Sequence, residues 1–250
     1  MKRFFEIVSA IRAFFCVDLR NIRELIRLQP LIQQSWPDSS MCFGLAIQVT
    51  DPVNGQLHAV ALYRFDGRLM IGDLQSHFRT RRADVRASDS LFWIAPDLSH
   101  EDQRILAATI DAWLDLNANK IPYSVAHPGG VIFKDNVWVG NEPGQGLTCA
   151  TFIVALFDEL GIPFIELGSW EERAGDVEWA ERILVALAPF MSAEHIEAQR
   201  ERIGTAIRVR PADIAAAGHL IRQDMDAPLP FRDVEPLSAT IEAQMLGRGQ

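Results

Sequence analysis

Hydrophobic residues change their spacing along the chain, and this change divides it into helical and extended segments. In residues 2–29, apolar side chains recur every three or four positions with basic groups between them, a pattern that predicts one amphipathic helix. Residues 42–49, 57–65 and 68–78 are short apolar runs bounded by turn residues, which is typical of β-strands. This part of the chain therefore predicts a helix followed by antiparallel strands.

The Asp66-Gly67 dipeptide lies between the second and third apolar runs, where it predicts a tight hairpin turn. Residues 226–250 are rich in proline and charge and are expected to form an extended or loosely docked tail. The other elements follow from periodicity and from capping and turn residues. They are a turn-rich stretch at 80–90, strands at 91–94 and 131–139, and helices at 97–116 with Ser99 as N-cap, 176–187, 193–203 and 211–223.

A buried helix that begins with a cysteine is expected within residues 144–161. Thr148, a suitable N-cap, precedes Cys149; an apolar run at helical spacing follows, and Gly161 is a good stop. Unpaired N–H groups and the positive end of the helix dipole favour a thiolate in this first turn. Cys149 is therefore a candidate nucleophile, and the alternative is a small buried residue used only for packing.

Composition narrows the choice of function without identifying it. The 250 residues are 48% hydrophobic and 23% charged, as in globular domains, and the net charge of −9 argues against a general nucleic-acid binder. The basic cluster Arg79, Arg81 and Arg82 is expected to be a solvated turn. Three cysteines at irregular spacing favour neither a disulfide framework nor a metal site, so we expect no metal, no cofactor and a cytoplasmic location.

A thiolate nucleophile needs a neighbouring base, and the base needs a group that orients it. If the hairpin turns at its Asp-Gly pair, His58 faces position 75 and has Asp73 as a diagonal neighbour. His77 is the competing base, because a different strand register would favour it. A solvated His58 and Asp73 at the edge of the sheet is the alternative interpretation. His100, His195 and His219 are expected on the surface, whereas His127, in a loop before Pro-Gly-Gly, is a further candidate for the base.

These residues resemble those of known cysteine enzymes. The segment His-Ala-Val-Ala-Leu from His58, with Asp73 on the next strand, looks like the base and orienting strands of papain-like enzymes. Leu-Thr-Cys-Ala-Thr-Phe-Ile around Cys149 is similar to the cysteine motif of the NlpC/P60 superfamily, and Ile-Pro-Tyr123 resembles a tyrosine element of those enzymes. The histidine precedes the cysteine here, an order that resembles the circularly permuted branch with YiiX-like and lecithin retinol acyltransferase-like proteins.

The resemblance covers residues 40–165 and implies an α+β fold. A papain-like antiparallel sheet would pack against the helix that carries the cysteine, with added N- and C-terminal helices. The implied site consists of Cys149 as nucleophile, His58 as base, Asp73 as orienting residue, His77 as alternative base, and Gln145 and Tyr123 as oxyanion or substrate contacts.

The chain is expected to form one domain, with an amphipathic helix in 1–36, the catalytic core, a helical extension at 166–225 and the tail. The expected function is hydrolysis of amide or peptide bonds through a Cys-His-Asp triad and a covalent acyl-enzyme. The alternatives are a thiol acyltransferase for lipid or thioester substrates, and an inactive papain-like binding module. Expected partners are a peptide, amide or acyl substrate and no nucleic acid. Peripheral membrane contact of the N-terminal helix is the alternative to its packing on the domain.

Overall fold

The structure is a computed structural model, and it describes residues 29–30, 42–86, 89, 91–125, 127 and 132–247. The helix predicted over 2–29 lies outside these residues, apart from Gln29. Within the described part, the protein has an α+β fold in which helices pack on an antiparallel sheet, as the sequence predicts at this level.

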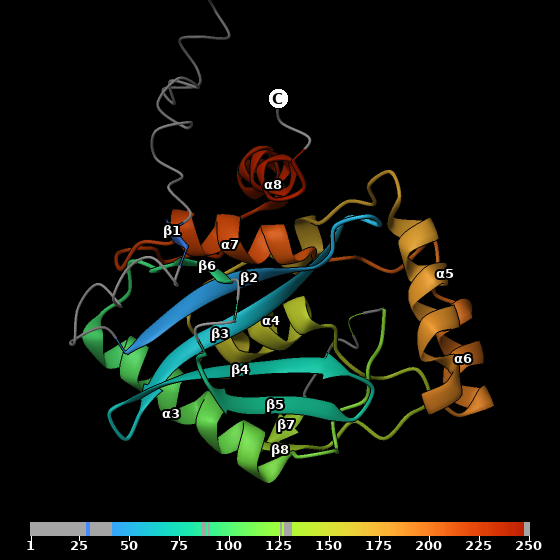
Figure 1. Ribbon diagram of the computed structural model, residues 1–250, viewed down its shortest axis with the longest axis horizontal. Helices are drawn as coiled ribbons and strands as arrows, with labels where there is room; N and C mark the ends of the chain where they lie inside the picture. The colour runs from blue at the N-terminus through green and yellow to red at the C-terminus, as the bar shows by residue number, and fades with distance from the viewer. Residues whose placement is uncertain are drawn as a thin grey trace, which may run out of the picture.

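The sheet of the described chain has the strand order β1-β6-β2-β3-β4-β5, and every neighbouring pair is antiparallel. Figure 1 shows β2 to β5 following one another across the sheet, with the short β6 beside β2. The strands are β1 (Gln29–Pro30), β2 (Phe43–Asp51), β3 (Gln56–Phe65), β4 (Arg68–Ser76), β5 (Arg79–Asp84) and β6 (Leu91–Ile94).

The predicted hairpin between β3 and β4 is confirmed. Asp66 and Gly67 both adopt positive φ angles, 49° and 74°, which is the conformation of the two-residue turns that match the twist of a hairpin. Phe65 pairs with Arg68, and the register continues to Ala61 and Gly72. Counting further along the two strands places position 58 opposite position 75, as the sequence analysis expects.

The helices α3 (His100–Leu116), α4 (Cys149–Glu159) and α7 (Pro211–Leu220) pack on this sheet and belong to one hydrophobic core with it. α3 begins at the predicted N-cap, Ser99. α4 lies within the core, and each of its residues from Cys149 to Phe157 is buried. Because apolar neighbours enclose the helix, the core fixes the position of its first residue.

The polar stretch after β4 is a strand, so the turn predicted there is wrong. β5 has the sequence Arg-Thr-Arg-Arg-Ala-Asp and pairs with β4 at the edge of the sheet. Charged side chains are common on edge strands, and they conceal the apolar alternation by which strands are recognised. The sequence signal for β5 was therefore weak.

Residues 131–139 were predicted as one strand, and their described part is a small hairpin. β7 (Phe133–Lys134) pairs with β8 (Val137–Trp138). Asp135 and Asn136 form the turn between them, with φ angles of 51° and 64°. Aspartate and asparagine tolerate this left-handed conformation better than other non-glycine residues, which explains the turn.

The C-terminal region is helical, so the extended tail predicted for 226–250 is wrong over most of its length. α8 (Phe231–Met245) packs against α7, and its side chains Val234, Leu237 and Ile241 are buried. Figure 1 shows α8 over α7, on the side of α7 away from the sheet. The apolar spacing of a helix is present in the sequence, but Pro236 lies inside this helix and argues against one.

The predicted helical segment between α4 and α7 contains α5 (Asp176–Leu187) and α6 (Ala193–Arg200). They stand together at one end of the sheet (orange, Figure 1). The described residues also form two short 3₁₀ turns, η2 (Leu167–Ser169) and η3 (Ala188–Phe190). None of the helices in the described chain has the length and apolar character needed to cross a membrane.

Candidate active site

Cys149 is the first residue of α4, and a reciprocal pair of hydrogen bonds fixes this start. The Thr151 backbone N–H donates to Thr148 Oγ1 at 3.0 Å, and the Thr148 backbone N–H donates to Thr151 Oγ1 at 2.7 Å. This capping box satisfies two N–H groups of the first turn. It places the Cys149 thiol at the positive end of the helix, as predicted.

The loop that leads into Cys149 lies against residues 122–124. Leu147 N–H donates to Pro122 O at 3.0 Å, and Ser124 N–H donates to Leu147 O at 3.2 Å. The Ser124 hydroxyl donates to Gly144 O at 2.7 Å. At Gly146 a Cβ atom would lie only 2.5 Å from Pro122 O, so this close approach requires glycine. The backbone before the cysteine is thus held in one path.

The structure brings His58, Asp73 and Cys149 together. His58 Nε2 lies 3.0 Å from Asp73 Oδ2, and the His58 ring lies close enough to the Cys149 sulfur for the two groups to shift each other's pKa. Because Nε2 contacts the carboxylate, Nδ1 is the ring nitrogen available to the sulfur. The Ala59 backbone N–H also lies close enough to Cys149 to lower the pKa of its thiol. The three residues are therefore in the order nucleophile, imidazole, carboxylate.

Electrostatics favour the charged forms of the thiol and the imidazole. Burial acts to raise the pKa of Cys149, but the His58 charge and the hydrogen bonds from His58 and Ala59 lower it overall. Burial acts to lower the pKa of His58, but the charge of Cys149 and the hydrogen bond to Asp73 raise it to about 10. Each group thus stabilises the charge of the other, which favours the thiolate and imidazolium forms over the neutral pair.

Asp73 is completely buried, and Arg81 binds it from β5. Arg81 Nε donates to Asp73 Oδ1 at 3.2 Å, and Arg81 Nη2 donates to Oδ2. Arg82 donates instead to Asp111 on α3, at 2.7 and 2.8 Å. The expectation of a solvated basic turn is wrong for Arg81, whose side chain is mostly buried; Arg82 is exposed as expected, but it lies on a strand and not in a turn. Once β5 is recognised as a strand, the direct pairing of Asp73 with Arg81 follows from the register.

His77, the alternative base, contacts other groups. Its Nδ1 accepts a hydrogen bond from Tyr123 N–H at 3.2 Å, and its ring lies 4.9 Å from that of His195. Burial and the neighbouring His195 lower the pKa of His77 to about 4, so it is neutral near pH 7. These contacts suit a structural histidine that orients the backbone of Tyr123.

Tyr123 lies close to Cys149. Burial, together with the charge of Cys149, raises the pKa of Tyr123, so its hydroxyl stays protonated and can donate a hydrogen bond. Its backbone carbonyl accepts from His195 Nε2 at 2.9 Å and from Gln199 Nε2 at 3.4 Å. α6 therefore helps to position the loop that carries Tyr123.

His195 was expected on the surface, and this expectation is wrong. Only 7% of the residue is exposed, and its Nδ1 accepts from Gly144 N–H at 3.0 Å. One imidazole thus joins the loop before Cys149 to the carbonyl of Tyr123. The charged sequence around His195 concealed this role, because a short helix can bury one face while the other remains polar. His100 is exposed and His219 is half-buried; burial lowers the pKa of His127.

Gln145 uses its side-chain carbonyl within its own loop. Gln145 Oε1 accepts from Glu142 N–H at 3.0 Å. Its side-chain amide group, the end that could donate to an oxyanion, belongs to the same planar unit and is therefore constrained by this bond. The contact supports a role in shaping the loop before Cys149.

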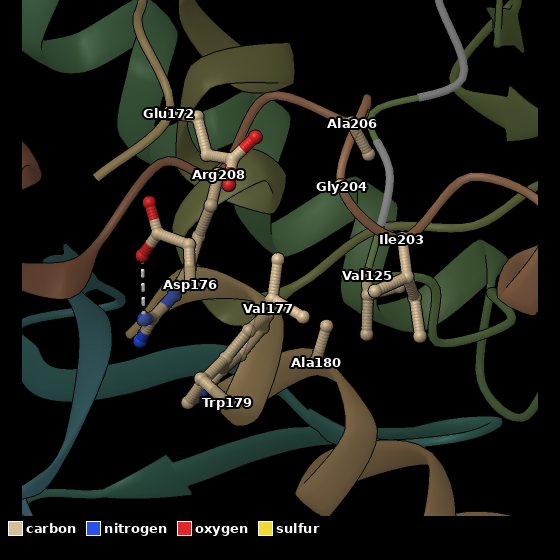
Figure 2. Close-up of a pocket in the computed structure, with 10 residues that line it drawn as sticks. All are labelled: Val125, Glu172, Asp176, Val177, Trp179, Ala180, Ile203, Gly204, Ala206 and Arg208. Carbon is tan, nitrogen blue, oxygen red and sulfur yellow. Dashed lines mark hydrogen bonds and ion pairs between the residues drawn. The ribbon is translucent and has the colours of Figure 1, made fainter. Parts of the chain in front are cut away.

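A small pocket lies beside this region, between α5 and residues 203–208 (Figure 2). Val125, two residues after Tyr123, lines it together with apolar side chains. On one wall Arg208 lies 3.8 Å over the Trp179 ring and donates to Asp176 Oδ1 at 2.8 Å. The residues that line the pocket do not include Cys149, His58 or Asp73.

The described residues contain no group of three or more His, Cys, Asp or Glu side chains arranged to hold a metal ion. Comparison of the chain with protein-family models, with curated proteins and with solved structures found no match.

Proposed function

We propose that the protein is a cysteine-dependent hydrolase of amide or peptide bonds that acts through Cys149, His58 and Asp73. The observation that carries the proposal is the imidazole of His58, which contacts a helix-terminal thiol and a fully buried carboxylate together. Nucleophile, base and orienting group in this arrangement are the components of thiol-dependent acyl chemistry.

The reaction begins when the Cys149 thiolate attacks the carbonyl carbon of the substrate. A C–S bond forms, and the carbonyl electron pair moves to the oxygen. Backbone N–H groups at the start of α4 and the protonated Tyr123 hydroxyl are the donors that support the oxyanion. When the tetrahedral intermediate collapses, the C–N bond breaks and His58 gives its proton to the amine. Asp73 holds the ring in place throughout.

Hydrolysis of the thioester completes the cycle. His58, now neutral, takes a proton from water as the oxygen attacks the acyl carbon. The C–S bond then breaks, which releases the acid and restores the thiolate–imidazolium pair. The chain order of histidine, carboxylate and cysteine supports assignment to the circularly permuted NlpC/P60 branch of papain-like enzymes, and a reducing cytoplasm would keep the thiol active.

The test combines alkylation with trapping of the acyl-enzyme. With limiting iodoacetamide near neutral pH, we expect Cys149 to react much faster than Cys42, although Cys149 is only 6% exposed and Cys42 is more accessible. Peptide and ester substrates should add an acyl group to Cys149, detected by mass spectrometry, and Cys149→Ser should not form this thioester. Equal alkylation rates at Cys149 and Cys42 would refute the proposal.

The same experiment separates hydrolysis from the alternatives. Loss of the acyl group to water supports a hydrolase, whereas its transfer to an added amine or lipid acceptor supports an acyltransferase. A fast-reacting thiol that forms no acyl adduct with any of these substrates favours an inactive binding module.

A further inference from the structure

The carboxylate that orients His58 has a second partner on the neighbouring strand. Asp73 is 0% exposed, and the side chain of Arg81 is 20% exposed. The arginine donates from Nε and Nη2 to both oxygens of Asp73, while His58 contacts Oδ2 alone. Arg81 therefore determines the plane of the carboxylate, because two parallel contacts fix a planar group where one contact lets it rotate.

The contact between Arg81 and Asp73 also affects the net charge of the buried site. Thiolate, imidazolium and carboxylate together carry one net negative charge in a buried region, where an uncompensated charge is unfavourable. Arg81 supplies the missing positive charge. The chain Cys149, His58, Asp73 and Arg81 then alternates in sign and is neutral overall.

We propose that Arg81 is a positioning residue of the thiol site, which fixes Asp73 against His58 and neutralises the buried group of four. This inference rests on the proposed function, because it assigns Arg81 to the same thiolate–imidazolium pair. Arg81 acts only through Asp73 and does not contact the reacting atoms.

The pair and the groups around it come from five parts of the fold. His58 (β3) meets Cys149 from α4 and Asp73 from β4, with Arg81 of β5 behind the carboxylate. The protonated Tyr123 lies on the thiol side. The negative charge of Asp73 acts on Cys149 to raise the thiol pKa, and the positive charge of Arg81 beside Asp73 opposes this effect.

Removing Arg81 should therefore move thiolate formation to higher pH. In Arg81→Met, we expect the midpoint of the Cys149 thiolate absorbance to rise by about one pH unit, because an opposite charge near a titrating group has effects of this size. Arg81→Lys keeps the charge but not the bidentate hydrogen bonding. Its thiolate midpoint should therefore rise by no more than half as much as the midpoint of Arg81→Met. A role limited to strand packing would leave the midpoint unchanged in any folded variant.

Arg82→Met is the matched control. Arg82 is the next residue on the same strand and forms a similar two-pronged ion pair, but its partner Asp111 lies on α3. The control removes the same charge one position away and should leave the thiolate midpoint in place. Circular dichroism would confirm that each variant is folded, and Asp73→Asn provides a second background in which Arg81→Met should cause no further shift.

The outcomes separate the inference from the proposed function. A low-pH thiolate in the wild type that is absent in Cys149→Ser, together with a shift in Arg81→Met but not in Arg82→Met, supports the inference. If the wild-type thiolate is present and the two arginine variants shift it equally or not at all, the positioning role is overturned while the enzyme proposal stands. If the wild type has no low-pH thiolate, both fail.

Discussion

Arg81 and Arg82 build similar ion pairs on the two sides of one edge strand. Successive residues of a strand point to opposite faces, so the two side chains reach Asp73 on β4 and Asp111 on α3. Each carboxylate also contacts a ring-bearing residue. For Asp73 this residue is His58 at 3.0 Å, and for Asp111 it is the hydroxyl of Tyr63 at 3.1 Å.

The cluster of Arg81, Asp73 and His58 differs from the cluster of Arg82, Asp111 and Tyr63 in its third residue. The two clusters also differ in the groups that adjoin this third residue. Burial and the charge of Asp111 raise the pKa of Tyr63, so the phenol remains a hydrogen-bond donor and helps to join α3 to the sheet. The imidazole of His58 can gain and lose a proton, and it adjoins the thiol of Cys149. The same arginine–carboxylate unit therefore contacts a packing residue in one place and adjoins the proposed thiol site in the other.

Replacing His58 should produce the largest effect that distinguishes the clusters. Without the imidazole, Cys149 loses the charge and the hydrogen bond that offset its burial, so its pKa should return upward. We expect His58→Ala to slow alkylation of Cys149 near neutral pH by about 100- to 1,000-fold, which corresponds to roughly 2.7–4 kcal/mol. Measurement by mass spectrometry of each labelled cysteine gives Cys42 as an internal control. An unchanged rate at Cys149 would show that the two clusters do not differ in chemistry.

Breaking the other cluster should instead affect stability. Asp111→Ala leaves Arg82 and the buried Tyr63 hydroxyl without their acceptor, and we expect a loss of about 2–4 kcal/mol in the free energy of unfolding. Urea denaturation of the variant and the wild type measures this difference. Alkylation of Cys149 in the folded variant should keep its wild-type rate. A slower rate would mean that the two sides of β5 are coupled.

The pH dependence of stability should give the smallest effect. The raised pKa of His58 contributes stability that is complete below its ordinary value of 6.5 and is lost as the pH rises through about 10. The lowered pKa of Cys149 contributes stability that is complete above its ordinary value of 9.0 and is lost as the pH falls through the folded value. Between 6.5 and 9.0 the two contributions change in opposite directions and offset each other.

Above pH 9.0 only the His58 contribution still changes, so wild-type stability should fall towards pH 10 by up to about 1.4 kcal/mol per pH unit. Urea unfolding at a series of pH values measures the fall, and His58→Gln should lack this component. If the variant and the wild type lose the same stability over this interval, the pKa of His58 is not raised in the folded protein.

Local sequence signals predicted several parts of the site. The Asp66-Gly67 turn set the register of β3 and β4, and that register gave the proximity of His58 to Asp73. Thr148 and the apolar run after it gave α4 and placed Cys149 at its start. Each of these signals acts between residues close in the chain, through backbone conformation or strand pairing, so the sequence alone carries them.

Sequence signals were weaker for polar residues whose hydrogen-bond and ion-pair partners come close only in the folded protein. Arg81 and His195 have charged or polar neighbours in sequence, and this pattern is shared by solvated turns and surface helices. Their burial depends on Asp73 in one case and on Gly144 and Tyr123 in the other. In the same way, α8 was concealed by Pro236, although contact with α7 buries its apolar side.

The amino-acid sequence by itself determined the α+β character, the hairpin, the helix that begins at Cys149 and the candidate residues for the thiol chemistry. Only the tertiary structure decided that His58 and not His77 adjoins the thiol, and that Arg81 binds the orienting carboxylate. The physical reason is the range of the interactions. Turns, caps and hairpin register involve neighbours in the chain, whereas a buried charge is stabilised by whichever opposite charge the packed elements bring to it.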